Sequence, residues 1–127
     1  RFLPNVIDGA LSGKEFPVSE GKQLRDFCHI DDIVRGILIS LESERAISEV
    51  INLASGVPIT IKSVVNNVQK IIGCNYAQFG LIPYRENESM SLYADISKAK
   101  KILSWEPEIS FEDGLLSTIQ YYKGLLK

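Results

Sequence analysis

The chain has 127 residues, of which 45% are hydrophobic and 24% are charged, a composition that is typical of one globular domain and excludes disorder, collagen and coiled coil. Its 14 basic and 16 acidic residues give a formal net charge of -2, so it lacks the basic field that attracts nucleic acid or an anionic membrane. No apolar stretch reaches the length of a membrane span. We therefore expect a cytoplasmic protein with no nucleic acid and no membrane as partner.

The first third of the chain predicts a helix, two strands and a second helix. Pro4 in a first turn and Gly13 as the stop mark a short amphipathic helix. Residues 16–18 and 24–30 predict two strands that pair as a hairpin. Asp31 is placed to cap the next helix, whose apolar face we expect to point into the core. That face consists of Ile33, Val34, Ile37, Leu38 and Leu41.

The rest of the chain continues to alternate strands and helices. Residues 50–53 predict a buried strand, and Thr60 is placed to cap a strongly amphipathic helix that ends at Gly73. Residues 76–82 predict another strand, and the polar connection over 84–93 is long enough to carry function. The last two helices are predicted to begin at Asp95 or Ser97 and at a capping box formed by Ser110 and Asp113. The pattern indicates an α/β fold, a small layered lobe of helices around a few short strands.

The cysteines and the single histidine offer little catalytic chemistry. Cys28 and Cys74 lack C-x-x-C spacing, so we expect two reduced thiols and no zinc knot. His29 follows Cys28 directly on a predicted strand, where neighbouring side chains point to opposite faces and cannot pair as nucleophile and base. His29, Asp31 and Asp32 allow a metal site or a capped helix with acidic first-turn residues, and the capped helix is favoured.

Two arginines are the strongest candidates for a binding site. The chain has no G-x-G-x-x-G turn and no Walker lysine, so we expect this chain itself to bind no cofactor. Arg25 and Arg85 each lie beside a predicted strand among uncharged or acidic residues, and two guanidinium groups hold a diphosphate well. The alternative is that each forms a surface ion pair of little energetic weight.

The segment Arg25-Asp26-Phe27-Cys28-His29-Ile30-Asp31-Asp32 resembles the R-D-[FY]-x-x-V-x-D segment of the extended short-chain dehydrogenase/reductases, the nucleotide-sugar epimerases and dehydratases. Further segments agree in order. Residues 50–56 resemble Y-N-[LV]-G-x-G, residues 94–99 resemble A-D-x-S-K-A, and residues 103–107 and 111–115 resemble L-G-W-x-P and [LF]-x-[ED]-G-L. The resemblance covers essentially the whole chain. It implies that residues 1–127 form a single substrate-binding lobe, the C-terminal part of an extended Rossmann-type enzyme, without the Rossmann cofactor domain.

The resemblance implies a sugar-nucleotide clamp and no catalytic residue. The family's Tyr-x-x-x-Lys pair and glycine-rich loop belong to the Rossmann domain, and neither pattern occurs here. Arg25 and Arg85 match arginines that contact the diphosphate. Glu88 matches a position that bonds the ribose, and Phe16 and Val18 border the base. The sequence departs from the family where Ser19-Glu20-Gly21 replaces Gly-Asp-Gly, where Leu24 replaces a small or polar residue, and where Ser104 replaces a glycine.

The expected function follows from this resemblance. It is to bind the nucleotide-diphosphate sugar of an NAD(P)-dependent epimerase or dehydratase, in which NAD or NADP belongs to the full-length enzyme. The chain opens without Met, so we expect it to be part of a longer protein. Because it lacks the cofactor loop and the catalytic Tyr/Lys pair, we expect it to be inactive alone. Its partners would be its own N-terminal Rossmann domain and, in the full-length enzyme, a second subunit of a homodimer. The alternative is a freestanding regulatory or protein-interaction module that keeps the fold without nucleotide binding.

Overall fold

The computed structural model describes residues 2–125, which form helices around a few short strands. The helices are α1 (Phe2–Leu11), α2 (Ile30–Glu42), the 3-10 helix η1 (Glu44–Ala46), α3 (Ile61–Ile72), α4 (Ser97–Leu103) and α5 (Phe111–Leu125). The strands are β1 (Phe16–Pro17), β2 (Leu24–Asp26), β3 (Pro58–Thr60), β4 (Ala77–Gln78) and β5 (Ser91–Leu92). The expected fold class is confirmed. None of the helices within residues 2–125 combines the length and the apolar character of a membrane span.

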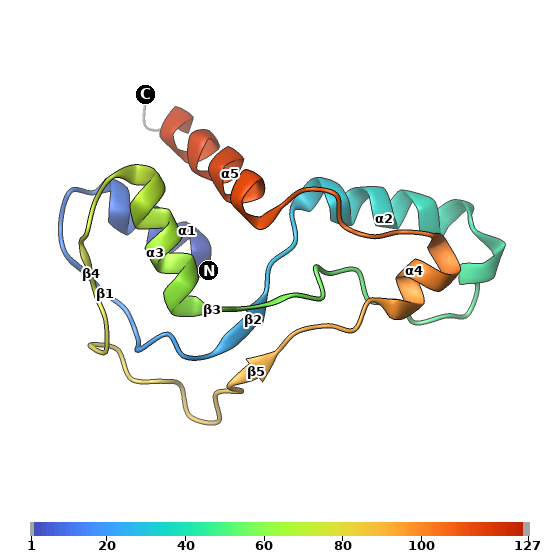
Figure 1. The fold of residues 1–127 in the computed structure, drawn as a ribbon, viewed down its shortest axis with the longest axis horizontal. Helices are drawn as coiled ribbons and strands as arrows, with labels where there is room; N and C mark the ends of the chain where they lie inside the picture. Colours follow the sequence, from blue (N-terminus) through green and yellow to red (C-terminus); the bar gives the residue numbers. More distant parts are fainter. Residues whose placement is uncertain (1, 126–127) are drawn as a thin grey trace.

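The helices form two groups that flank the strands. Helices α1, α3 and α5 pack on one another at one end of the molecule, and α2 and α4 lie at the other end (Figure 1). The main core lies within the first group, and its members are Val6, Ile7, Ala10, Val18, Ile61, Val65, Val68, Leu115 and Ile119. A second, smaller core forms around Ala99, Leu103 and Trp105. The segment that connects the two groups contains β2.

Helix α3 forms as its sequence predicts, because the residues that cap its two ends are neighbours in the sequence. The Thr60 hydroxyl accepts a hydrogen bond from the Ser63 N–H at 3.1 Å, and Gly73 ends the helix in the left-handed region with φ +84°. Glycine adopts that conformation at little steric cost. The predicted capping box of α5 is also present, since the Asp113 N–H donates to the Ser110 hydroxyl at 3.1 Å. Both predictions are confirmed.

The predicted hairpin is wrong. Strand β1 pairs in parallel with β4 through Phe16 and Ala77, and β2 does not contact it as a strand. Instead, β2 lies between β3, with which it is antiparallel, and β5, with which it is parallel. The strand predicted over 76–82 is reduced to the two residues of β4. The chain between β1 and β2 therefore joins two separate small sheets.

The start of α2 differs from its prediction. The helix begins at Ile30, so the strand expected over 24–30 ends at Asp26. His29, not Asp31, is the N-cap, and its Nδ1 accepts a hydrogen bond from the Asp31 N–H at 3.3 Å. The predicted Asp31 cap is therefore wrong, although Asp31 and Asp32 do lie in the first turn, where acidic side chains suit the helix dipole.

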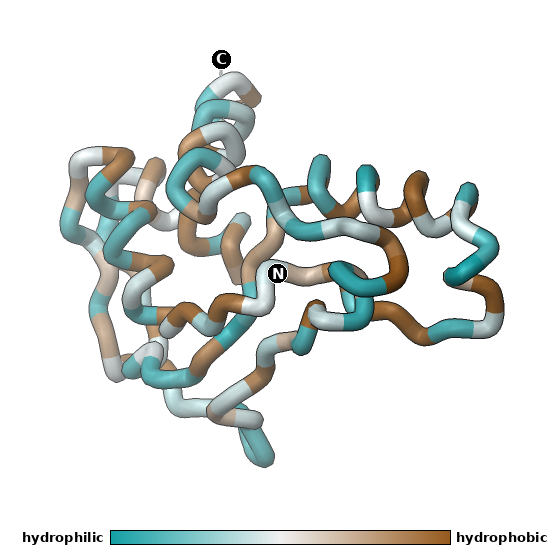
Figure 2. Tube along the Cα trace, turned by 45° about the vertical axis from the view of Figure 1, so that its right-hand side comes forward, coloured by the Kyte–Doolittle hydropathy of each residue, from teal (hydrophilic) through white to brown (hydrophobic). Residues whose placement is uncertain are grey.

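The apolar face of α2 does not point into a core. Leu41 is 78% exposed, and Val34, Ile37 and Leu38 are also exposed. The helix packs instead through Gly36, where an added Cβ would lie 2.8 Å from the Leu53 side chain. Figure 2 shows hydrophobic positions recurring along α2. The prediction of a core-facing stripe is wrong for residues 2–125, because nothing among them covers it.

The strand predicted over 50–53 is also absent from the described residues. Residues 50–53 form no strand, and Val50 is 84% exposed. A strand requires a hydrogen-bonded neighbour, and none of the five strands that form within residues 2–125 pairs with this segment.

The Asp32 side chain links α2 to the segment that precedes α5. Its buried carboxylate accepts hydrogen bonds from the Glu108 N–H at 3.0 Å and the Ile109 N–H at 2.9 Å, and it pairs with Arg35 at 2.9 Å. Its backbone carbonyl accepts from the Trp105 indole at 3.0 Å. Burial alone raises the pKa of Asp32, but these donors outweigh burial and hold that pKa below its ordinary value.

We predict that Asp32→Asn lowers the free energy of unfolding at neutral pH by about 2 kcal/mol, because the amide cannot accept from every donor around it. A carboxylate with a depressed pKa stabilises the fold above its unfolded-state pKa of about 3.9 and loses that effect as the pH falls through the folded-state pKa. The difference between the two proteins should therefore shrink below about pH 4.

Urea unfolding at a series of pH values measures this difference. Asp31→Asn is the control, because Asp31 is exposed and its removal should change stability by less than about 1 kcal/mol. Equal losses in the two variants at neutral pH would contradict the role assigned to Asp32.

Candidate binding site

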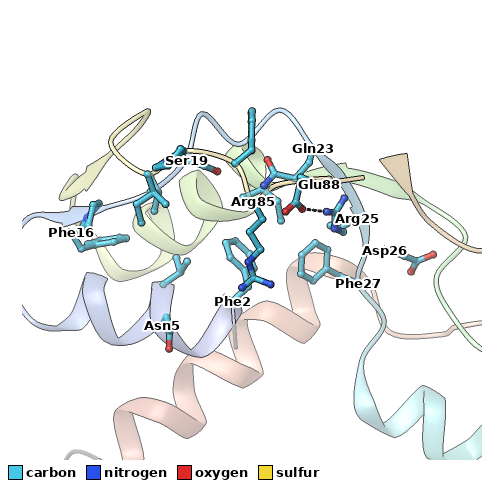
Figure 3. Close-up of a pocket in the computed structure, with 17 residues that line it drawn as sticks. Phe2, Asn5, Phe16, Ser19, Gln23, Arg25, Asp26, Phe27, Arg85 and Glu88 are labelled. Carbon is cyan, nitrogen blue, oxygen red and sulfur yellow. Dashed lines mark hydrogen bonds and ion pairs between the residues drawn. The ribbon is translucent and has the colours of Figure 1, made fainter. Parts of the chain in front are cut away.

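A cavity of about 630 Å³ opens beside β2. Its walls come from α1, β1, β2 and the loop over residues 81–90, which lie side by side in the fold (Figure 3). The five residues that the sequence selects for a site all line it, and they are Phe16, Val18, Arg25, Arg85 and Glu88. The fold thus brings together residues up to 72 positions apart in the chain.

Arg25 and Glu88 form an ion pair at one end of the cavity. The Arg25 guanidinium donates to the Glu88 carboxylate, and it also donates to the Leu24 carbonyl oxygen at 2.7 Å. The two charged side chains are half-buried, at 22% and 18% exposed, so salt screens the pair less than a pair on the open surface. These bonds use two of the five N–H donors of arginine. The guanidinium therefore retains capacity for an anion.

Arg85 extends from the loop over residues 81–90 toward Phe2 (Figure 3). Its guanidinium makes no ion pair with any of residues 2–125. Two hydrogen bonds join this loop to the chain around β2. The Tyr84 hydroxyl accepts one from the Lys22 N–H at 3.1 Å, and the Leu24 N–H donates the other to the Met90 carbonyl oxygen at 2.9 Å. This loop therefore lines the cavity.

Apolar and aromatic side chains form much of the cavity wall. Phe16 and Val18 come from β1 and the residue after it, and Phe2 and Phe27 add further walls from α1 and from the end of β2. The Phe2 and Phe27 rings lie 6.2 Å apart, centre to centre. Aromatic rings provide flat apolar surfaces on which a planar group packs. The cavity thus combines cationic and aromatic side chains, and Figure 3 shows Phe2 and Phe27 near the arginines and Phe16 farther from Arg25 and Glu88.

Sequence analysis overlooked Gln23, Phe27 and Tyr84, which also line the cavity. Side chains alternate along an extended chain, so positions 23, 25 and 27 share one face. Once Arg25 was selected, this alternation was the signal that could have identified Gln23 and Phe27. Nothing in the local sequence marks Tyr84, whose position depends on a contact between segments 62 residues apart.

Comparison with known proteins assigns the chain to a family. The family model described as GDP-mannose 4,6 dehydratase matches residues 1–118. The chain belongs to this family. It thereby belongs to the extended short-chain dehydrogenase/reductases, the family of the NAD-dependent epimerases and dehydratases, as the sequence motifs indicate.

Two curated relatives show how much of a family member the chain represents. It is 42% identical over 105 residues to UDP-glucuronate 4-epimerase from Thermodesulfobacterium geofontis, covering 82% of this chain and 32% of that protein. It is 32% identical over 124 residues to UDP-glucuronic acid decarboxylase 1 from Danio rerio, covering 96% of this chain and 29% of that protein. The chain thus spans about a third of the length of these relatives.

Solved structures agree with the fold. An epimerase from Methanothermobacter thermautotrophicus superposes with a TM-score of 0.92 at 26% identity, covering 99% of this chain and 38% of that one. UDP-glucuronic acid 4-epimerase from Bacillus cereus, solved in complex with UDP-glucuronic acid and NAD, gives 0.89 at 32% identity, covering 98% and 40%. The chain has the fold of the C-terminal part of these Rossmann-type enzymes.

Residues 2–125 contain no glycine-rich turn of the kind that binds NAD in a Rossmann domain. Such a site needs a strand, a glycine-rich turn and a helix N-terminus in sequence, and no G-x-G-x-x-G turn precedes any of the helices here. The residues that line the cavity carry no such turn either. Within residues 2–125, no cluster of three histidine, cysteine or carboxylate side chains could hold a metal ion.

Cys28 is not available as a nucleophile. Burial raises the pKa of its thiol to about 11, and the carboxylates of Asp32 and Asp26 raise it further. The neighbouring His29 bonds elsewhere, with Nε2 3.2 Å from the Ser117 hydroxyl. Because the thiolate is the reactive form, Cys28 is inert near neutral pH.

We predict that iodoacetamide at about pH 8 modifies Cys28 at least about 100-fold more slowly in the folded chain than in urea, because the unfolded thiol has a pKa of about 8.5. The measurement uses a Cys74→Ser variant, in which Cys28 is the only thiol, with mass spectrometry to follow modification. Comparable rates in the two conditions would contradict a raised pKa.

Proposed function

We propose that this chain is the nucleotide-sugar-binding lobe of an NAD(P)-dependent epimerase or dehydratase. The observation that carries the proposal is one cavity that Arg25, Arg85 and Glu88 line together with aromatic side chains. The family assignment supports the same conclusion, and a structural neighbour from Bacillus cereus was solved with UDP-glucuronic acid and NAD.

The chemistry of the cavity fits a nucleoside diphosphate from end to end. Two guanidinium groups neutralise a diphosphate through paired N–H bonds. The aromatic side chains of the wall offer a planar base a surface to pack on, and the Glu88 carboxylate accepts hydrogen bonds from a ribose diol. The volume of about 630 Å³ lies within the range usual for pockets that bury most of a small ligand.

Binding and reaction are divided between parts of the protein in this proposal. The described residues hold and orient the sugar nucleotide, which fixes the sugar in position and so lowers the entropic barrier of the reaction. NAD or NADP, when bound by the full-length enzyme, supplies hydride transfer. This chain contributes no Tyr-x-x-x-Lys pair, and we propose that it is inactive alone.

The exposed apolar face of α2 fits a second part of the proposal. Ile37, Leu38 and Leu41 are 47%, 57% and 78% exposed, and contiguous apolar surface of this kind marks an interaction site. We propose that it packs against the Rossmann domain of the same protein, since the chain covers about a third of its relatives' length.

We predict that the purified chain binds UDP saturably and that Arg25→Ala and Arg85→Ala each weaken binding about tenfold or more, because each removes a charge-assisted contact to the diphosphate. Isothermal titration calorimetry measures the affinities. Thermal melting of each variant establishes that it is folded.

Arg45→Ala is the matched control, because Arg45 lies in η1 outside the cavity and its guanidinium bonds only the Lys101 carbonyl, at 3.2 Å, among residues 2–125. This variant should bind UDP as the wild type does. Absence of saturable binding by the wild type would overturn the clamp, as would equal effects of all three substitutions.

We predict that the purified chain self-associates through α2 and that the double variant Leu38→Lys with Leu41→Lys is monomeric, because the lysines place charge on the apolar face. Sedimentation velocity over a concentration series measures this. The control is Leu116→Lys, since Leu116 is exposed on α5. A wild-type chain that stays monomeric at every concentration would rule out the apolar interface.

A further inference from the structure

The loop over residues 81–90 is anchored to the rest of the fold at both ends. At one end, the Ile82 N–H donates to the Val18 carbonyl oxygen at 3.2 Å. At the other end, the Met90 carbonyl oxygen accepts the hydrogen bond from the Leu24 N–H. These bonds fix the points at which the loop leaves the fold and returns to it. Movement of the loop is therefore confined to the residues between them.

Two side chains hold the loop against the rest of the chain between these anchors. Every residue of the loop is exposed except Tyr84 and Glu88. Tyr84 accepts from the Lys22 N–H through its hydroxyl, and Glu88 accepts from the Arg25 guanidinium. Within residues 2–125, no other hydrogen bond or ion pair joins residues 83–89 to the rest of the chain. A segment held by so few contacts opens locally at a small cost in free energy.

A tight turn in the loop directs Glu88 back toward Arg25 (Figure 3). The Glu88 N–H donates to the Arg85 carbonyl oxygen at 3.0 Å, and Asn87 lies in the left-handed region with φ +61°. Asparagine adopts that region more readily than most residues that carry a Cβ. The Arg25 side chain is only 22% exposed beside its partner from the loop. The position of the loop therefore decides how much of the Arg25 guanidinium an incoming anion can reach.

We propose that the loop over residues 81–90 is a gate on the cavity and that the hydrogen bond of the Tyr84 hydroxyl keeps it closed. This inference rests on the proposed function, because the gate sets how fast a nucleotide enters and leaves. The loop carries Arg85 and Glu88, so it is closed while the ligand is held, and it opens for the ligand to reach Arg25. Tyr84 is a positioning residue, since its hydroxyl bonds the chain beside β2.

A gate of this kind predicts faster ligand exchange with little change in affinity. Tyr84→Phe keeps the ring and removes the hydroxyl, so the open form should become about fivefold more populated through the loss of one hydrogen bond. Opening precedes both entry and departure of the ligand. Both rates should therefore rise about fivefold, while Kd stays within about twofold of the wild type. Loss of a direct contact to the ligand would instead raise Kd, mainly through faster dissociation.

Two measurements on the purified chain test the gate. Cleavage by endoproteinase Glu-C after Glu86, followed by mass spectrometry, reports the population of the open loop. It should be about fivefold faster in Tyr84→Phe than in the wild type, and UDP should slow it in both proteins. Phosphorus nuclear magnetic resonance line shapes of UDP give its dissociation rate, and calorimetry gives its Kd. The association rate follows from these two quantities.

A second variant opens the gate by another route. In Asn87→Ala, alanine is strained at φ +61°, which destabilises the closed turn. Cleavage after Glu86 and dissociation of UDP should therefore both be faster, although Asn87 lies outside the cavity wall. Tyr121→Phe is the control, because Tyr121 is 65% exposed on α5, and it should leave both rates unchanged. Thermal melting establishes that each variant is folded.

Each outcome separates this inference from the proposed function. If the wild type binds UDP and depends on Arg25, while both variants match its cleavage and dissociation rates, the gate is wrong and the clamp stands. If cleavage is faster but UDP dissociates at the wild-type rate, the loop moves without controlling exchange, and the gate is again wrong. If Tyr84→Phe raises Kd about tenfold or more at an unchanged association rate, the hydroxyl acts on the ligand and the inference is overturned. If the wild type binds no UDP, both proposals fail.

Discussion

The cavity depends on the hydrogen bonds that the Asp26 carboxylate accepts. Its two oxygens take the Ser55 N–H at 2.8 Å, the Ser55 hydroxyl at 2.7 Å, the Gly56 N–H at 2.9 Å and the Ala94 N–H at 3.3 Å. One side chain at the end of β2 thereby holds two segments that lie 29 and 68 residues farther along the chain. Side chains alternate along a strand, so fixing Asp26 on one side of β2 fixes Arg25 on the other, toward the cavity.

The segment over residues 25–32 therefore has two roles, one in holding the fold together and one in lining the cavity. Asp26 and Asp32 join remote parts of the fold through several N–H donors each, which compensates for taking a carboxylate out of water. Arg25 and Phe27, the residues on either side of Asp26, line the cavity. A carboxylate that gathers backbone donors from several segments is hard to replace, because any substitute leaves some of those donors unpaired. The segment that carries the family resemblance thus holds the fold together at two positions and lines the cavity at two others.

What the sequence could predict follows from the distance over which each interaction acts. The Thr60 cap and the Ser110 capping box involve residues three apart and were predicted correctly. The hairpin prediction failed because the parallel partner of β1 lies about 60 residues away, at Ala77, and no local pattern encodes that pairing. The apolar stripe of α2 indicates that something covers it, but periodicity alone does not say whether the cover belongs to the same chain. Arg25 and Arg85 were selected from their surroundings in the sequence and again from the family resemblance, and Glu88 from the resemblance alone. That Gln23 Oε1 is buried and unpaired is apparent only in the folded structure of residues 2–125.

The pairing of Glu88 with Arg25 limits what the cavity can select. Arg25, Arg85 and Glu88 together leave one net positive charge, so electrostatic attraction to a bare anion is weaker than two arginines alone would provide. A free diphosphate would also meet the Glu88 carboxylate, which repels it and offers no hydrogen-bond donor. A ligand that carries hydroxyl groups beside its diphosphate satisfies that carboxylate while the guanidinium groups take the phosphates. If the cavity binds a sugar nucleotide as proposed, Glu88 weakens the attraction for anions in general but increases specificity. It does so because it favours a nucleoside diphosphate over free inorganic diphosphate.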